Sequence, residues 1–116
     1  MHTNECIFCN IITGQAPARV VYRDQTVTAF WDARPIAPVH ILVVPNQHII
    51  SVNQTVAAHE PMLGHLITTA RQIAIEQGVD QSGYRLVINT GPDAGQSIFH
   101  LHLHIIGGRQ MPFHFR

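Results

Sequence analysis

Short runs of apolar residues, most of them rich in Val and Ile, recur along the chain between turn-forming residues. Runs of this length bounded by turn signals are typical of β-strands. Residues 19–23 and 27–31 are separated by Asp24 and Gln25, and this spacing predicts a hairpin. The other predicted strands cover residues 40–44, 84–89 and 100–106.

Between the third and fourth predicted strands, the apolar positions change to a helical spacing. Steps of three and four residues within residues 60–77 form one stripe, made of Leu63, Leu66, Ile67, Ala70, Ile73 and Ala74. Pro61 suits the first turn of this helix and Gly78 the position just past its end. A shorter helix is predicted near residues 7–12. This order predicts an α+β domain with a mainly antiparallel, five-stranded sheet.

The composition is that of a folded protein. The chain has 116 residues, of which 46% are hydrophobic and 12% charged, and this balance excludes a disordered tail. We expect a single domain spanning residues 1–116. Lys and Arg together number 7, as do Asp and Glu, so no net charge attracts nucleic acid or an anionic membrane. All of the cations are arginines, which excludes Schiff-base chemistry and a P-loop lysine.

Two features bear on the compartment. The apolar runs are far shorter than the roughly 20 residues that cross a bilayer, and residues 1–14 lack the basic start and apolar stretch of a secretory signal. Cys6 and Cys9 are the only cysteines, and a secreted disulfide framework needs more and wider pairs. The sequence therefore predicts a cytoplasmic protein with reduced thiols and with neither a membrane nor a nucleic-acid partner.

Histidine is unusually frequent, with 9 residues, and three of them alternate with leucines on the last predicted strand. Because strand side chains alternate between faces, His100, His102 and His104 share one face and Leu101 and Leu103 the other. From the rise of a strand, neighbouring histidines lie about 7 Å apart and the outer two about 13 Å apart. Metal–nitrogen distances of about 2 Å disfavour one metal centre bound by all three. A chance run of tolerated polar residues is the alternative interpretation.

A neutral imidazole is a nucleophile near neutral pH, and phosphorus is a suitable electrophile for it. The loop before the histidines, residues 89–97, contains two glycines, an amide and a hydroxyl. Such a loop can direct backbone N–H groups at phosphate oxygens, although by itself it would be an ordinary turn. Joined directly to the histidines, it predicts a phosphate site beside the nucleophile.

The segment GQSIFHLHLHIIGGRQM at residues 95–111 resembles the signature of the histidine triad (HIT) family. Its Ser after Gln96 and its Gly-Gly-Arg-Gln-Met extension resemble the Hint branch, the histidine triad nucleotide-binding proteins. Further matches follow in order over nearly the whole chain: CIFCNII at 6–12, FWD at 30–32, PVHILVVP at 38–45 and YRLVIN at 84–89.

The resemblance implies a HIT-like fold, with a five-stranded antiparallel sheet carrying one long and one short helix. It implies a homodimer with a continuous sheet. It also implies a nucleotide hydrolase or transferase acting at the α-phosphorus. In the Hint branch the usual substrates are purine nucleoside phosphoramidates, such as adenosine 5′-monophosphoramidate. No organic cofactor and no catalytic metal is expected.

Matching positions imply the catalytic residues His102, His104, His100 and Ser97. His102 would be the nucleophile that forms a nucleotidyl-histidine intermediate, with its second nitrogen bonded to the carbonyl of His100. His104 would contact the phosphate or the leaving group. Ser97 would place a hydroxyl near the leaving nitrogen, which must gain a proton.

The remaining matches imply substrate contacts. The loop amides of Gly95, Gln96 and Ser97, with the side chain of Asn89, would hold the phosphate oxygens. Asp32 would bind the ribose hydroxyls, and the base would lie between the apolar residues Ile7, Phe8, Ile11 and Phe30. Without the resemblance, Asp32 would be a turn residue and the four apolar residues ordinary core. A flat apolar slot predicts a modest preference for adenine over guanine.

Cys6 and Cys9 have the spacing of a zinc knuckle. A redox pair is the alternative, although such a pair normally follows a strand in a βαβ unit that this sequence does not predict. Some HIT proteins complete a zinc site with a histidine after the third strand and the first histidine of the triad, here His48 and His100. The resemblance thus implies structural zinc bound by Cys6, Cys9, His48 and His100.

The sequence gives further expectations for the other histidines and for the tail. His40, His59 and His65 are expected to be structural or surface residues, and His2 and His114 lie near the termini. The tail PFHFR at residues 112–116 lacks the Trp and paired Pro typical of the Hint branch, which leaves the leaving-group preference open.

Two other functions remain possible from the sequence. One is a dinucleoside polyphosphate hydrolase of the fragile-histidine-triad branch, which usually has Thr-Val-Pro where Ser97-Ile-Phe stands here. The other is a nucleotide-binding or regulatory protein with vestigial turnover, against which the intact triad and Ser97 argue.

Overall fold

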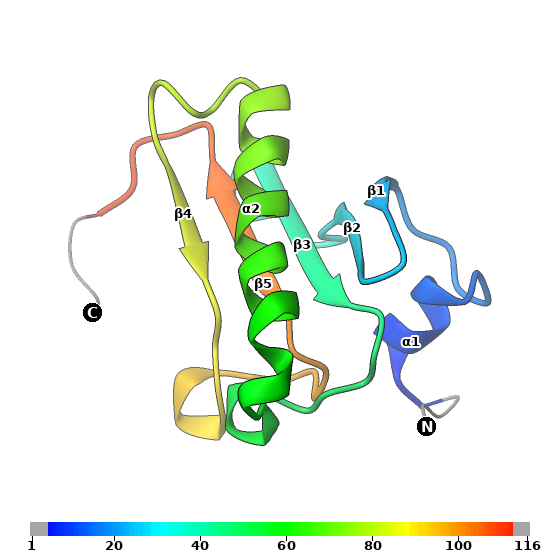
Figure 1. The fold of residues 1–116 in the computed structure, drawn as a ribbon. Coiled ribbons are helices and arrows are strands. Elements are labelled where there is room, and N and C mark those ends of the chain that lie inside the picture. The colour runs from blue at the N-terminus through cyan, green and yellow to red at the C-terminus, as the bar shows by residue number, and fades with distance from the viewer. Residues whose placement is uncertain (1–4, 113–116) are drawn as a thin grey trace.

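The computed structural model describes residues 5–112 (Figure 1), so His2 and His114 lie outside the described part. In chain order its main elements are α1 Ile7–Ile12, β1 Val20–Arg23, β2 Val27–Trp31, β3 Val39–Pro45, α2 Glu60–Glu76, β4 Tyr84–Val87 and β5 Leu103–Gly107. Short 3-10 helices occupy Val52–Gln54, Ala57–His59 and Pro92–Ala94. None of the helices within the described range has both the length and the apolar character needed to span a bilayer.

The five strands form one antiparallel sheet in the order β1-β2-β3-β5-β4. β1 and β2 form the predicted hairpin, and β3 lies against both β2 and β5. Strands β3 and β5 are therefore neighbours although α2 and β4 separate them in the chain. The predicted α+β fold with one long and one short helix is confirmed.

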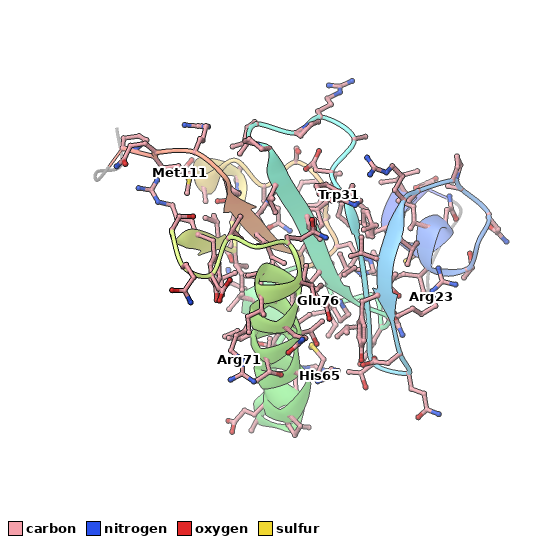
Figure 2. All side chains as sticks on the ribbon, turned by 90° about the horizontal axis from the view of Figure 1, so that it is seen from above. Arg23, Trp31, His65, Arg71, Glu76 and Met111 are labelled. Carbon is pink, nitrogen blue, oxygen red and sulfur yellow. The ribbon has the colours of Figure 1, made fainter. Side chains whose placement is uncertain are left out.

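Each face of the sheet carries its own apolar core. In β3, the side chains of Ile41 and Val43 belong to the core under α2, whereas those of Leu42 and Val44 belong to the core under α1. This division follows from the alternation of strand side chains. Seen from above in Figure 2, α2 lies along one side of the sheet with side chains filling the space between them. All seven residues of β3 are buried because both faces are covered.

The long helix forms where its sequence pattern predicts it. Pro61 lies in the first turn, and Gly78 follows the C-cap with a φ of 75° that glycine adopts without strain. Leu66, Ala70 and Ile73 are buried against the sheet. Ile67, assigned to the same stripe by its spacing, is 52% exposed because it lies at the margin of the packed face.

The last strand is shorter than predicted and begins at Leu103 instead of residue 100. The pairing of β3 with β5 ends at Val43 and Leu103, and the amide of Leu101 donates to the carbonyl of Ile49. Proline has no amide hydrogen for the ladder, and the Pro45 carbonyl accepts a hydrogen bond from the His100 ring instead. The segment that carries His100 and His102 therefore precedes the strand. Strand β4 likewise ends at Val87, two residues before the predicted end.

Candidate active site

A pocket of about 750 Å³ lies on the side of the sheet that carries α1. Its walls come from α1, the end of β2 and the segment after it, β3, and the residues around the histidine row. Eight of the residues assigned to the site line it: Ile7, Phe8, Ile11, Phe30, Asp32, Ser97, His102 and His104. Residues separated by most of the chain thus meet in one cavity, of the size typical for small-molecule sites.

His102 is held in one orientation by its own backbone neighbour. Its Nδ1 lies 2.7 Å from the carbonyl oxygen of His100. A carbonyl only accepts, so Nδ1 carries the hydrogen and Nε2 keeps its lone pair. Burial lowers the pKa of His102, although the bond to the His100 carbonyl and the charge of Asp32 oppose it. The ring is therefore neutral at neutral pH, with a nucleophilic nitrogen available in the pocket.

A fourth histidine, His40, is buried beside this site, as expected for a structural residue, and it also contacts His104. The Nε2 atom of His40 lies 2.9 Å from Nδ1 of His104 and 3.4 Å from Oδ2 of Asp32. His40 is 4% exposed, and burial lowers its pKa against the opposing charge of Asp32. Burial, followed by repulsion from His102 and His40, lowers the pKa of His104 to about 4.

The register of the sheet explains how His40 reaches the site. Leu42 pairs with His104 across β3 and β5, and directly paired residues share a face. His40 lies two residues from Leu42 and therefore on the same face. Strand alternation in the sequence predicts that His40 and Leu42 share one face of their strand. Only knowledge that β3 and β5 are neighbours could have placed it beside His104.

The apolar side of the pocket is built from α1 and β2. The rings of Phe8 and Phe30 meet edge to face with centroids 5.4 Å apart, and Phe8 also contacts the His102 ring at 5.1 Å. Ile7 is 44% exposed, whereas Ile11 is buried. Beyond the predicted residues, Leu42 and Ile98 add to the apolar wall. A planar base can pack against such a surface.

Asp32 makes the turn contact that the sequence allowed, and it also lines the pocket. Its Oδ1 accepts a hydrogen bond from the Arg34 amide at 2.7 Å, as a turn aspartate does. The other carboxylate oxygen, Oδ2, lies near His40, and Asp32 is one of the residues that line the pocket.

Two further residues line the pocket, Arg19 and Trp31. The guanidinium carbon of Arg19 lies 4.9 Å from the centre of the Trp31 ring. The sequence assigned no role to Arg19, and it assigned none to Trp31 although Trp31 lies within the matched FWD segment.

The loop before the histidines departs from the prediction. The amide of Gly95 donates to the carbonyl of Pro92, and that of Gln96 to the carbonyl of Gly91. The Gln96 side chain is also engaged, because its Oε1 accepts from the Gly91 amide and its Nε2 donates to Ile50. Gly95 and Gln96 therefore shape the loop and do not present donors to a phosphate. Ser97 is the residue of this trio that lines the pocket.

Asn89, like Gly95 and Gln96, was predicted to hold the phosphate but does not line the pocket. It follows β4 and is half-buried, but it is not among the residues that line the cavity. Asn89 was assigned to the phosphate because it matches the family motif, but the cavity of this structure does not reach it.

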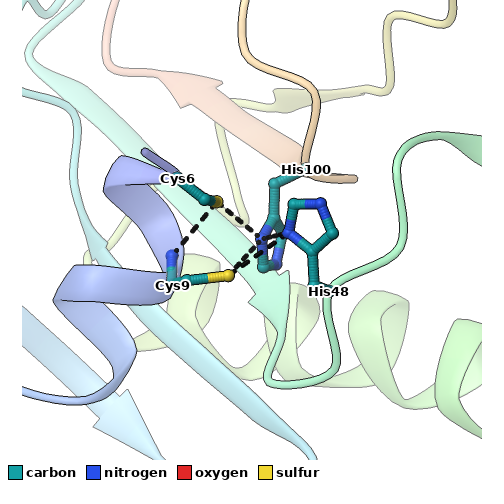
Figure 3. Close-up of side chains that lie close together, drawn as sticks. All are labelled: Cys6, Cys9, His48 and His100. Atoms are coloured by element: carbon teal, nitrogen blue, oxygen red, sulfur yellow. Dashed lines mark hydrogen bonds between the residues drawn. The ribbon is translucent and has the colours of Figure 1, made fainter. Parts of the chain in front are cut away.

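A second cluster gathers Cys6, Cys9, His48 and His100 (Figure 3). The Sγ of Cys6 is 3.3 Å from Nδ1 of His100, and the Sγ of Cys9 is 3.2 Å from Nδ1 of His48. The Nδ1 atoms of His48 and His100 are 3.2 Å apart, and all four ligand atoms lie within 4.8 Å of one another. Figure 3 shows the thiols of Cys6, which caps α1, and of Cys9, within α1, pointing at the two rings. These are the four residues that the sequence predicts to bind a metal.

The chemistry of this cluster fits a metal ion. Zinc–sulfur and zinc–nitrogen bonds of about 2.3 and 2.0 Å give a tetrahedron with edges of roughly 3.3 to 3.8 Å, close to the separations found here. Nε2 of His100 donates to the Pro45 carbonyl at 2.9 Å, which leaves Nδ1 unprotonated for a metal. Burial, together with Cys6, raises the pKa of Cys9 to about 12, and a bound cation would reverse that effect.

The comparison with known proteins decides the family. Residues 13–111 match the model of the HIT domain. The chain belongs to the HIT family. Over 107 residues, this HIT protein is 47% identical to the purine nucleoside phosphoramidase of Escherichia coli K12, covering 92% of this chain and 90% of that one.

Solved structures of HIT proteins share the fold. A histidine triad protein from Clostridium difficile superposes with a TM-score of 0.94 at 41% identity, covering 99% of this chain and 100% of the other. A zinc-bound histidine triad family protein from Mycobacterium smegmatis gives a TM-score of 0.80 at 32% identity, covering 90% of this chain and 76% of that one.

Proposed function

We propose that this HIT protein is a purine nucleoside phosphoramidase that hydrolyses substrates such as adenosine 5′-monophosphoramidate. The observation that carries the proposal is the state of His102, a neutral ring with Nδ1 bonded to the His100 carbonyl and Nε2 left as a nucleophile. The E. coli relative that bears this name, similar over nearly the whole chain, supports the choice of reaction.

In the proposed reaction, Nε2 of His102 attacks the α-phosphorus and forms a phosphorus–nitrogen bond to the ring. The bond between phosphorus and the leaving nitrogen breaks, and that nitrogen gains a proton to depart as an amine. We assign the Ser97 hydroxyl to this proton transfer and His104 to the phosphate. Water then cleaves the nucleotidyl-histidine and releases the nucleoside monophosphate. Asp32 binds the ribose, and Phe8, Phe30, Ile7 and Ile11 hold the base.

Parallel assays test this function. Adenosine 5′-monophosphoramidate and a diadenosine polyphosphate are offered to the wild type and to His102→Ala. We expect faster turnover of the phosphoramidate and at least a thousandfold loss in the variant, roughly the loss seen when a nucleophile is removed. Mass spectrometry of acid-quenched enzyme should locate the nucleotide on His102.

The other outcomes identify the rival functions. Faster turnover of the polyphosphate would favour a dinucleoside polyphosphate hydrolase. Binding of AMP with turnover of neither substrate would favour a nucleotide-binding or regulatory protein. Turnover that survives His102→Ala would refute both hydrolase mechanisms.

We also propose that the metal of the second cluster is zinc, bound by Cys6, Cys9, His48 and His100, with a structural role. Two thiolates and two imidazoles are a ligand set that zinc prefers, and the zinc-bound M. smegmatis relative supports this metal. The ion would fix the ring of His100, whose carbonyl orients His102. Protein purified under reducing conditions should contain about one zinc per chain, and Cys9→Ser should lose it.

We further propose a homodimer with a continuous sheet, joined through β4. β4 and β1 are the two edge strands, but the pairing of β1 with β2 is irregular between Val20 and Tyr22, and such irregularities protect an edge. Helix α2 also exposes apolar side chains, Ile67 and Ile75, which are 52% and 46% exposed. Light scattering coupled to gel filtration should give twice the chain mass.

We propose a cytoplasmic location because both cysteines serve the metal cluster as thiols.

A further inference from the structure

The segment between β2 and β3 contains a backbone group that determines which nitrogen of His40 is protonated. The amide nitrogen of Ile36 lies 3.2 Å from Nδ1 of His40 and donates to it. An amide N–H can only donate, so Nδ1 of His40 must hold a lone pair. In a neutral ring the hydrogen is then on Nε2. The burial of His40 keeps the ring neutral.

The hydrogen on His40 in turn determines the tautomer of His104. Nε2 of His40 lies 2.9 Å from Nδ1 of His104, and two N–H groups cannot face each other at that distance. Nδ1 of His104 therefore accepts, and the hydrogen of His104 is on Nε2. Asp32, 3.4 Å from the same His40 nitrogen, can share the donor without changing this result.

The Nε2 atom of His104 is the buried side-chain polar atom that has no hydrogen-bond partner among residues 5–112. A buried N–H without an acceptor is costly, so such a group in an active site indicates an acceptor supplied by a ligand. His104 lines the nucleotide pocket beside His102, and the two ring centroids are 4.9 Å apart. An oxygen of the phosphate under attack at His102 is the acceptor that the proposed reaction brings there.

The position of Ile36 depends on the turn that follows β5. Arg109 donates from Nε to the carbonyl oxygen of Ile36 at 3.2 Å, and its Nη1 donates to the carbonyl of Gln110. Gly108 has a φ of 92°, and a Cβ atom there would lie 3.0 Å from Cβ of Pro38. The Gly108–Arg109 turn thus packs closely on the segment that carries Ile36. Neither residue touches the pocket.

From this chain of contacts we infer that Arg109 and the backbone amide of Ile36 are positioning residues that fix His104 as the Nε2–H tautomer. His104 then meets the substrate as a neutral hydrogen-bond donor to a phosphate oxygen. The inference rests on the proposed function only for the identity of that acceptor. The tautomer itself is a property of the protein without substrate, and it can be measured separately.

The decisive variant is Ile36→Pro, which removes the amide hydrogen and leaves a small exposed side chain at a position that is 59% exposed. Ile36→Ala is the matched control, because it changes the side chain and keeps the amide. Nitrogen-15 NMR of histidine-labelled protein distinguishes a protonated ring nitrogen from an unprotonated one. We expect the Nε2–H form of His104 alone in the wild type and in Ile36→Ala, and a mixture of tautomers in Ile36→Pro.

Kinetics provide the second measurement. Loss of one orienting hydrogen bond should lower kcat for the phosphoramidate about two- to tenfold in Ile36→Pro, with KM unchanged. Arg109→Ala should give a smaller effect in the same direction, and Arg109→Lys, which can still donate to the carbonyl, should recover part of it. A purely structural role of Arg109 would alter thermal stability and leave the His104 spectrum as in the wild type.

Two results would overturn the inference. One is a wild-type spectrum with the hydrogen on Nδ1 of His104. The other is an unchanged His104 tautomer in folded Ile36→Pro. If Ile36→Pro does not fold, His40→Phe replaces it, because a phenyl ring has no hydrogen to donate and should likewise release the tautomer. Absence of phosphoramidate turnover in the wild type would refute the proposed function, while the NMR comparison would still test the positioning.

Discussion

The carboxylate of Asp24 ties the β1–β2 hairpin to helix α2, and its replacement should lower stability in a pH-dependent way. Oδ1 accepts from the amides of Thr26 and Val27 at 2.7 and 2.8 Å. Oδ2 accepts from the Tyr22 hydroxyl at 2.7 Å and from Nε2 of His65, on α2, at 2.6 Å. Asp24→Asn keeps an oxygen for the two turn amides, so it removes mainly the charge and the link to the helix.

The magnitude follows from these contacts. A hydrogen bond to a charged group contributes about 1.5 to 3 kcal/mol when buried, but the side chains of His65 and Asp24 are 38% and 27% exposed. Solvent screening reduces that contribution, so we expect Asp24→Asn to lower the free energy of unfolding by about 1 to 2 kcal/mol at pH 7. For a chain of this size the fall in Tm should be about 4 to 8 °C.

The pH dependence has a definite sign. Burial by itself raises the pKa of Asp24, but its four hydrogen bonds, the one from His65 foremost, outweigh burial and hold the pKa well below its ordinary value. A carboxylate with a depressed pKa contributes stability that is fully present above its unfolded-state pKa of about 3.9 and is lost as the pH falls toward the folded value. The difference between wild type and variant should therefore narrow below about pH 4.

Urea unfolding at several pH values measures this difference, with Asp80→Asn as the control. Asp80 is exposed, and its carboxylate accepts a long hydrogen bond from the neighbouring Gln81 side chain, at 3.4 Å. A stability difference between wild type and Asp24→Asn that stays constant from pH 7 to pH 3 would refute the assignment to the charge. An equal loss in Asp80→Asn would do the same.

Three further outcomes are expected. Removing the metal with a chelator should lower the Tm of the wild type and leave that of Cys9→Ser unchanged, because the variant has no complete ligand set to lose. Gly108→Ala should cost about 1 to 2 kcal/mol of unfolding free energy in a denaturant titration, since alanine is strained at positive φ and its Cβ would crowd Pro38; wild-type stability would contradict this. Phe8→Leu should raise the KM for the phosphoramidate about three- to tenfold through the lost ring contacts, including the one with His102, and an unchanged KM would place the base elsewhere.

Much of the fold could be predicted because its signals are local. Helix α2 follows from its apolar spacing together with Pro61 and Gly78, and α1 lies at the predicted residues 7–12. The prediction was too long for β5, because strand-like alternation in residues 100–102 gave no sign that the pairing with β3 would end at Leu103. A strand ends where its partner stops pairing, and the partner is not visible in a single segment.

The sequence likewise predicted some residues of the candidate site and missed others. The family motif led to the cysteine and histidine cluster and to eight of the pocket residues. It did not show that His40 contacts His104, and it assigned phosphate contacts to Gly95 and Gln96, whose amides and side chain are used within the loop. A motif records residue types at fixed spacing, but it does not record which donors the folded loop has already used.

The sequence by itself determined the strand and helix pattern, the alternation that separates His102 from its leucine neighbours, and the residue types for nucleophilic and metal chemistry. These depend on interactions within a few residues, so spacing along the chain is enough to reveal them. The tertiary structure decided that β3 lies beside β5, that His40 therefore meets His104, and that the turn at Arg109 reaches Ile36. Those contacts join segments far apart in the chain, and only packing of the whole sheet brings their donors and acceptors within hydrogen-bonding distance.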